Sequence, residues 1–171
     1  GRLHPLGKTI DGWTKDVMQT DATESASFFV IHNYFTSGSD VPSNDELFDE
    51  VDDLAIMASG VESMLSTYSG ASDMLPLALT EFNIGQLSTG GCSATLQHIT
   101  ALWHVLILGE AIQNPLYGSV CSFAWADVAS ECADEGRGDY GMVSRSNADF
   151  DDGTAMPTLF AYALFAYAAG D

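Results

Sequence analysis

The chain has 171 residues, of which 46% are hydrophobic and 17% charged, a balance typical of one globular domain with a sizeable core. Its 24 acidic and 5 basic residues give a net charge of −19 at pH 7. So acidic a chain lacks the basic footprint that nucleic acid or an anionic membrane surface requires, and we predict neither as a partner.

The beginning of the chain predicts a short helix followed by a strand. Residues 11–18 carry apolar side chains four apart, which is typical of an amphipathic helix, and a loop over 19–25 follows. Residues 27–35 are rich in aromatic and β-branched side chains and are predicted to form a strand.

A long amphipathic helix is predicted next. Ser43 or Asn44 can cap its start, with acidic residues in its first turn, and it continues to about Tyr68. One face is apolar at helical spacing, formed by Leu47, Val51, Leu54, Met57, Val61 and Leu65.

The most informative segment is the predicted strand 75–83. Leu75 to Leu79 carry no charge, which suits a strand buried on both faces of a parallel sheet. Glu81 then appears where that strand ends, and a glycine-rich loop over 85–91 follows.

The remainder repeats the alternation of helix and strand. A helix over 93–113 is stopped by Asn114-Pro115, and 119–125 is predicted to be a third strand. An acidic loop over 129–145 leads to a last helix over 155–169.

Repeated strand–helix units with buried strands imply an α/β fold with a parallel sheet and outer helices. Three such strands would leave two bare edges, which invites aggregation. We therefore expect the C-terminal portion of a (β/α)8 barrel, with the first strands upstream of Gly1. A small independent flavodoxin-like domain is the alternative, and a structure separates the two, because a complete domain would cover both edges of the sheet.

Polar side chains follow each predicted strand. His32 and Tyr34 alternate onto one face, Glu81 and Asn83 do the same, and Trp125 ends the third strand. Taken singly, such a His, Tyr or Trp is more often a packing group and such a Glu is more often solvated. At the carboxyl ends of barrel strands, however, such residues build active sites.

Together these strand ends resemble the last three strands of the barrel glycoside hydrolases of clan A, which act with retention. The matching residues are His32-Asn33-Tyr34, Thr80-Glu81-Phe82-Asn83 and Trp125. The closing segment 157–171 resembles the final helix of agarase-like, porphyranase-like and arabinofuranosidase-like members. The resemblance implies that residues 1–171 form one partial catalytic domain holding strands six to eight.

The resemblance also implies roles and a substrate. Glu81 would be the nucleophile, Tyr34 its hydrogen-bond partner, His32 and Trp125 sugar-binding residues, and Asn83 a binding residue that also holds the adjoining loop. The substrate would be a β-linked polysaccharide or oligosaccharide, with agar or porphyran as candidates. The same likeness implies a secreted or periplasmic protein without a cofactor, and a non-catalytic carbohydrate-binding or structural barrel is the alternative.

One family feature is absent from the sequence. The acid/base of this clan is a glutamate that follows Asn at the fourth strand, and no Asn-Glu pair occurs in the chain. We expect it in a missing N-terminal half of the barrel. Asp127 and Asp139, on the loop after the third strand, are the acids of this chain that could instead reach the cleft.

Other motifs point to no further chemistry. Cys92, Cys121 and Cys132 have no metal-site spacing, and Cys92 and Cys121 lie in settings where a thiol is usually a packing group. His98 and His104 lie six apart on one helix, which does not make a shared ligand face. We therefore predict no metal site.

Overall fold

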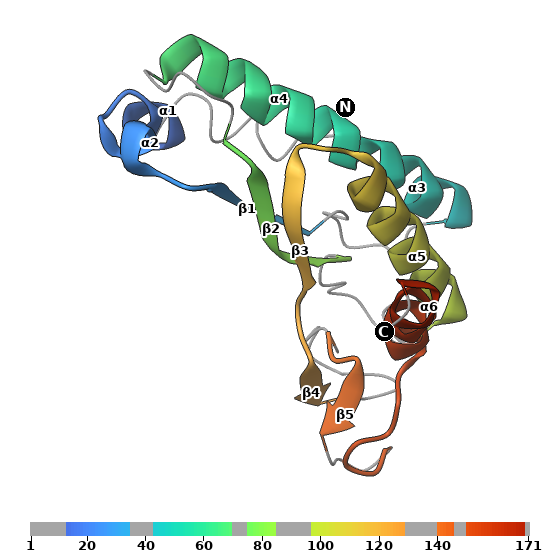
Figure 1. Ribbon diagram of the computed structural model, residues 1–171. Helices are drawn as coiled ribbons and strands as arrows, with labels where there is room; N and C mark the ends of the chain where they lie inside the picture. Colours follow the sequence, from blue (N-terminus) through green and yellow to red (C-terminus); the bar gives the residue numbers. More distant parts are fainter. Residues whose placement is uncertain are drawn as a thin grey trace.

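The computed structural model describes residues 13–34, 43–69, 75–84, 97–128, 140–145 and 150–169. Its centre is a three-stranded sheet whose strands lie side by side in chain order, β1–β2–β3 (Figure 1). Both pairs are parallel, as predicted from the alternation of strands and helices. The strands are β1 (Phe29–Tyr34), β2 (Leu77–Asn83) and β3 (Tyr117–Ser122).

The helices follow the predicted positions with small changes at their ends. The predicted second helix is divided into α3 (Asn44–Asp49), a 3₁₀ turn η2 (Glu50–Asp52) and α4 (Asp53–Tyr68). Ser43 and Glu46 form a reciprocal capping box at its start, which confirms the predicted cap. The others are α1 (Trp13–Met18), α2 (Ala22–Ser25, where a loop was expected), α5 (His98–Gln113) and α6 (Pro157–Ala169).

The hydrophobic core lies on one face of the sheet. Leu77 and Leu79 of β2 are fully buried there against Leu54 of α4 and Trp103 of α5. On the opposite face Val30 of β1 is 47% exposed. Figure 1 shows α4 and α5 on the same side of the sheet. Sequential parallel strands covered on one face are typical of a barrel wall, whereas a doubly wound flavodoxin-like sheet is covered on both faces.

A second, smaller sheet follows β3 where only a loop was predicted. It is a parallel pair of β4 (Ala126–Val128) and β5 (Val143–Arg145). The close approach depends on Gly141, because a Cβ added there would lie 2.4 Å from the backbone nitrogen of Asp127. The prediction that β3 continues to Trp125 was wrong, because the strand ends at Ser122 and Trp125 lies in the bend before β4.

Two further expectations concern cysteines and membranes. Cys121 is a free and exposed thiol, so the prediction that it packs in the core was wrong. Cys92 and Cys132 lie outside the described residues. Among the described helices, none combines the length and the apolar character needed to cross a bilayer.

His104 is a fully buried titratable group. It lies on α5, with its ring centroid 5.2 Å from that of Phe82, 5.0 Å from that of Trp103 and 6.1 Å from that of Tyr162. Neither ring nitrogen has a hydrogen-bond partner among the residues that the structure describes. Burial lowers the pKa of His104 to about 3, so the ring is neutral in the folded protein.

This burial predicts an acid-sensitive fold. The unfolded imidazole takes up a proton near its ordinary pKa of about 6.5, whereas the folded one resists protonation to about pH 3. The contribution of His104 to stability is therefore fully present above about pH 6.5 and is lost as the pH falls towards 3. We expect His104→Leu to move the acid-unfolding midpoint to lower pH, measured by circular dichroism. His98→Gln at the exposed start of α5 is the matched control, and an equal shift in both variants would contradict this account.

Candidate active site

The site is built on an irregularity in the middle strand. Ile31 of β1 pairs with Leu79 of β2, but the next residue, His32, pairs with Glu81, so Thr80 is passed over. The pairing of β2 with β3 shifts over the same stretch. Strand β2 therefore holds one extra residue relative to both neighbours, which is a β-bulge, a feature frequent at barrel rims and beside active sites.

The bulge changes which face each side chain occupies. Before it Leu77 and Leu79 point into the core, and after it Phe82 and Ile84 do so. Simple alternation would have sent Glu81 into the core with Leu77 and Leu79. With one residue inserted, Glu81 lies on the open face instead. The sequence carries this signal, because its apolar alternation breaks phase across Thr80-Glu81, although reading the segment as one uninterrupted strand missed it.

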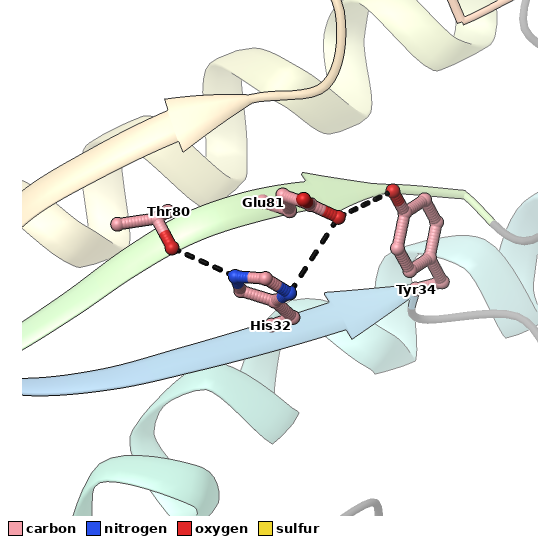
Figure 2. Close-up of polar contacts among 4 residues, drawn as sticks. All are labelled: His32, Tyr34, Thr80 and Glu81. Carbon is pink, nitrogen blue, oxygen red and sulfur yellow. Dashed lines mark hydrogen bonds and ion pairs between the residues drawn. The ribbon is translucent and has the colours of Figure 1, made fainter.

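Glu81 is held by two side chains of β1. The Tyr34 hydroxyl donates to Glu81 Oε2 at 3.0 Å, and His32 Nδ1 lies 3.5 Å from the same oxygen (Figure 2). The other ring nitrogen, His32 Nε2, lies 2.8 Å from Thr80 Oγ1. The Tyr34–Glu81 hydrogen bond confirms the contact predicted from the two strand ends.

The electrostatics of the pair fix the direction of this bond. Burial raises the pKa of Tyr34 well above its ordinary value, and the hydrogen bond to Glu81 and the carboxylate charge raise it further. The phenol therefore remains protonated and donates. Both contacts of the carboxylate go to Oε2, so within the described part of the chain Oε1 of Glu81 has no partner.

Three aromatic rings gather beside this carboxylate. Tyr34 packs edge-on against Phe123, with centroids 6.4 Å apart, and against Tyr140 at 5.6 Å, while Phe123 and Tyr140 are 5.9 Å apart. We call these residues the aromatic trio. Phe123 and Tyr140 escaped the sequence reasoning. Phe123 directly follows β3, and Trp125 was taken as the aromatic residue of that strand end. Tyr140 falls in the segment that was predicted to be an acidic loop, where the sequence has no periodic signal.

Asn83 connects the trio to the strand of Glu81. Its side chain is buried, and Nδ2 donates to the backbone carbonyls of Phe123 at 2.6 Å and Tyr140 at 3.4 Å. Its Oδ1 accepts the backbone N–H of Ile84 at 2.8 Å. A side chain engaged in this way has a positioning role, in line with the expectation that Asn83 holds the adjoining loop, and direct contact with substrate stays a prediction.

Of the other predicted residues, the structure describes Trp125 and Asp127. Trp125 is 66% exposed, and among the described aromatic rings it is Phe123 that packs beside Tyr34. Asp127 Oδ2 accepts the backbone N–H of Tyr140 at 3.4 Å, and Asp139 lies outside the described residues. Within the described ranges no group of three or more His, Cys, Asp and Glu side chains is placed to hold a metal ion.

Comparison with known proteins gives matches at the level of fold. No protein-family model and no curated protein matches the sequence. A Bifidobacterium dentium β-glucuronidase complexed with coumarin-3-O-glucuronide is similar over 89% of this chain, with 16% identity and a TM-score of 0.51. A Faecalibacterium prausnitzii β-glucuronidase matches over 91%, with 13% identity and a TM-score of 0.47.

The similarity to the Bifidobacterium dentium protein shows the fold alone. The chain has an α/β fold that matches one part of a glycoside hydrolase barrel, and it spans about a quarter of the matched chains, 23% and 24%. The Bifidobacterium dentium protein is a β-glucuronidase, so an agarase-like or arabinofuranosidase-like character has no support from this similarity.

The buried amide of Asn83 predicts a large effect on stability. Asn83→Ala would leave the backbone carbonyl of Phe123 and the backbone N–H of Ile84 without the partner that the structure describes. It would also remove the weaker of two hydrogen bonds to the carbonyl of Tyr140, which keeps the N–H of Ala124. We expect a loss of about 1–3 kcal/mol in the free energy of unfolding. Urea denaturation measures it. The matched control is Gln113→Ala, whose exposed amide also bonds a backbone carbonyl, that of Gly109 at 3.1 Å. We expect less than about 0.5 kcal/mol there, and equal losses in the two variants would contradict the anchoring role.

Proposed function

We propose that this chain forms part of the catalytic domain of a retaining glycoside hydrolase acting on a β-linked glycan, with Glu81 as the nucleophile. One observation carries the proposal. Glu81 lies at the carboxyl end of a parallel strand, on the open face of the sheet, with one carboxylate oxygen held by the Tyr34 phenol. A carboxylate that is restrained at one oxygen, and whose other oxygen has no partner among the described residues, is suited to attack a carbon centre.

The chemistry follows from that arrangement. Glu81 Oε1 would attack the anomeric carbon and form a C–O bond while the glycosidic C–O bond breaks. An acid/base carboxyl group about 5–5.5 Å away would protonate the departing oxygen and then deprotonate the water that releases the sugar. The donated hydrogen bond from Tyr34 orients the carboxylate of the nucleophile.

The acid/base residue is proposed to come from another strand of the same barrel, as the family resemblance implies. Glu81 makes its described polar contacts with a phenol and an imidazole, and Asp127 is engaged with the backbone of Tyr140. Residues 1–171 alone are therefore expected to supply one catalytic carboxylate of two.

The aromatic trio gives the site a surface for sugar. Phe123 is 40% exposed and lies beside Tyr34, so its ring is available to a ligand seated at Glu81. Aromatic faces pack well against the C–H faces of pyranose rings. The same exposed aromatic residues, together with Trp125, support the second candidate, a carbohydrate-binding barrel without turnover. The two candidates differ only in whether the charge of Glu81 is needed.

The charge of Glu81 is tested by a nearly isosteric substitution. We expect Glu81→Gln in the complete protein to lower kcat by at least about a thousandfold while sugar binding changes little, because it removes the attacking charge. The assay measures reducing ends released from agar, porphyran, xylan and arabinan, and calorimetry measures binding. Glu62→Gln, exposed on α4, is the matched control. Full turnover by the Glu81→Gln protein would remove Glu81 from the mechanism, and binding without turnover in the unsubstituted protein would favour the carbohydrate-binding candidate.

A retaining mechanism passes through a covalent glycosyl-enzyme intermediate. Trapping this intermediate is a second test of Glu81 as the nucleophile. A 2-deoxy-2-fluoro glycoside with a good leaving group slows release and accumulates the glycosyl-enzyme. Peptide mass spectrometry of the complete protein should place the added sugar on the peptide that contains Glu81. Labelling of a different carboxylate would assign the nucleophile elsewhere.

The net charge of the chain predicts a preference between substrates of different charge. At −19, the chain repels anionic glycans, and the repulsion weakens as salt screens it. We expect neutral aryl β-galactosides or β-glucosides to be hydrolysed with higher kcat/KM than the matching β-glucuronide or sulfated sugar. The ratio of kcat/KM for the neutral substrate to kcat/KM for the anionic one should fall as the salt concentration rises from about 0.05 to 0.5 M. Preference for the glucuronide at both salt concentrations would contradict the electrostatic argument.

A further inference from the structure

We propose that Thr80 is a positioning residue that selects the Nδ1–H tautomer of His32, so that the imidazole becomes a second hydrogen-bond donor to Glu81. The catalytic consequence rests on the function proposed above, whereas the tautomer itself does not. The geometry that points to it is the placement of one ring between two side chains of the neighbouring strand (Figure 2).

The β-bulge is what brings both partners to one ring. In an ordinary strand successive side chains point to opposite faces, so Thr80 and Glu81 would never share a neighbour. The extra residue in β2 puts both opposite His32. The hydroxyl of Thr80 then lies 2.8 Å from Nε2 while the carboxylate lies 3.5 Å from Nδ1.

The two neutral tautomers are not equivalent in this setting. With the proton on Nε2, the lone pair of Nδ1 would point at a carboxylate oxygen, which is repulsive. With the proton on Nδ1, the ring donates to Glu81 and the Nε2 lone pair needs a donor of its own. Thr80 supplies that donor, because a hydroxyl can donate as well as accept. The hydrogen bond at one ring nitrogen thus sets the role of the other.

The consequence is a carboxylate restrained from two sides at one oxygen. Tyr34 and His32 both approach Oε2 of Glu81, which fixes the rotation of the carboxylate and leaves Oε1 to react. The His32 side chain is 49% exposed, so water can replace part of what Thr80 supplies. The kinetic effect of Thr80 is therefore expected to be modest, whereas its effect on the tautomer is direct.

The first experiment reads the tautomer without any substrate. Histidines of the complete protein are labelled with ¹⁵N, and His32 is assigned by comparison with His32→Gln, at a pH about two units above the ordinary imidazole pKa of about 6.5. Two-bond ¹H–¹⁵N correlation spectra should show Nδ1 protonated and Nε2 bare in the wild type and in Thr80→Ser. In Thr80→Val the population should move towards Nε2–H, the form that histidine favours in water. A wild-type ring protonated on Nε2, or no change in the Val variant, would overturn the proposal.

The second experiment reads the effect on turnover. Thr80→Val should lower kcat about threefold to tenfold with little change in KM, and Thr80→Ser should restore most of it. Thr67→Val is the matched control, because the hydroxyl of Thr67 donates to the backbone carbonyl of Ser63 on the exposed face of α4. If kcat falls in Thr80→Val and is equally low in Thr80→Ser, the hydroxyl of residue 80 does not have the proposed role. If Glu81 is not the nucleophile, kcat should be the same in the wild type and in all Thr80 variants. The tautomer measurement would still decide this inference.

Discussion

The site depends on one extra residue in β2. Strand β2 and the residue after it have to bury Leu77, Leu79, Phe82 and Ile84 against the helices, since these side chains form part of the single core. Strict alternation cannot bury all four, because Leu79 and Phe82 are three apart. The insertion between them resolves the conflict and turns Glu81 to the open face. Burial of these four apolar side chains packs the sheet against its helices, and it also places the carboxylate of Glu81 on the open face.

The chemistry of Glu81 then follows from its neighbours on β1. Two side chains of that strand contact the same carboxylate oxygen, Oε2. Tyr34 donates a hydrogen bond to it at 3.0 Å, and the raised pKa of its phenol keeps that proton in place. His32 lies next to it on the same oxygen. The alternation of β1 puts both side chains on the face where the bulge puts Glu81.

Much of this arrangement was predictable from the sequence, and the reasons for the rest are specific. The parallel order of three strands follows from the alternation of apolar strands and amphipathic helices, which is a local pattern. The Tyr34–Glu81 contact was expected from the family resemblance of the strand ends. The end of β3 was predicted three residues too late, because Phe123 and Trp125 continue its alternation. Strands β4 and β5 were missed because each is three residues long and its partner lies 17 residues away in the sequence (Ala126 pairs with Val143). Such pairing depends on contacts between distant residues, and a period of two over three residues carries almost no signal.

The missed elements are the ones that complete the site. Asn83 is on the strand of Glu81, yet its amide binds the carbonyls of Phe123 and Tyr140, which precede β4 and β5, the two strands of the small sheet. The backbone of Ala124 bonds that of Tyr140, and Met142 bonds back to Ala124, so the two segments hold each other as well. The aromatic trio is therefore positioned by backbone contacts between distant segments, with one buried side chain joining them to β2. The carboxylate can be found from strand ends, but the surface beside it arises only when these segments meet.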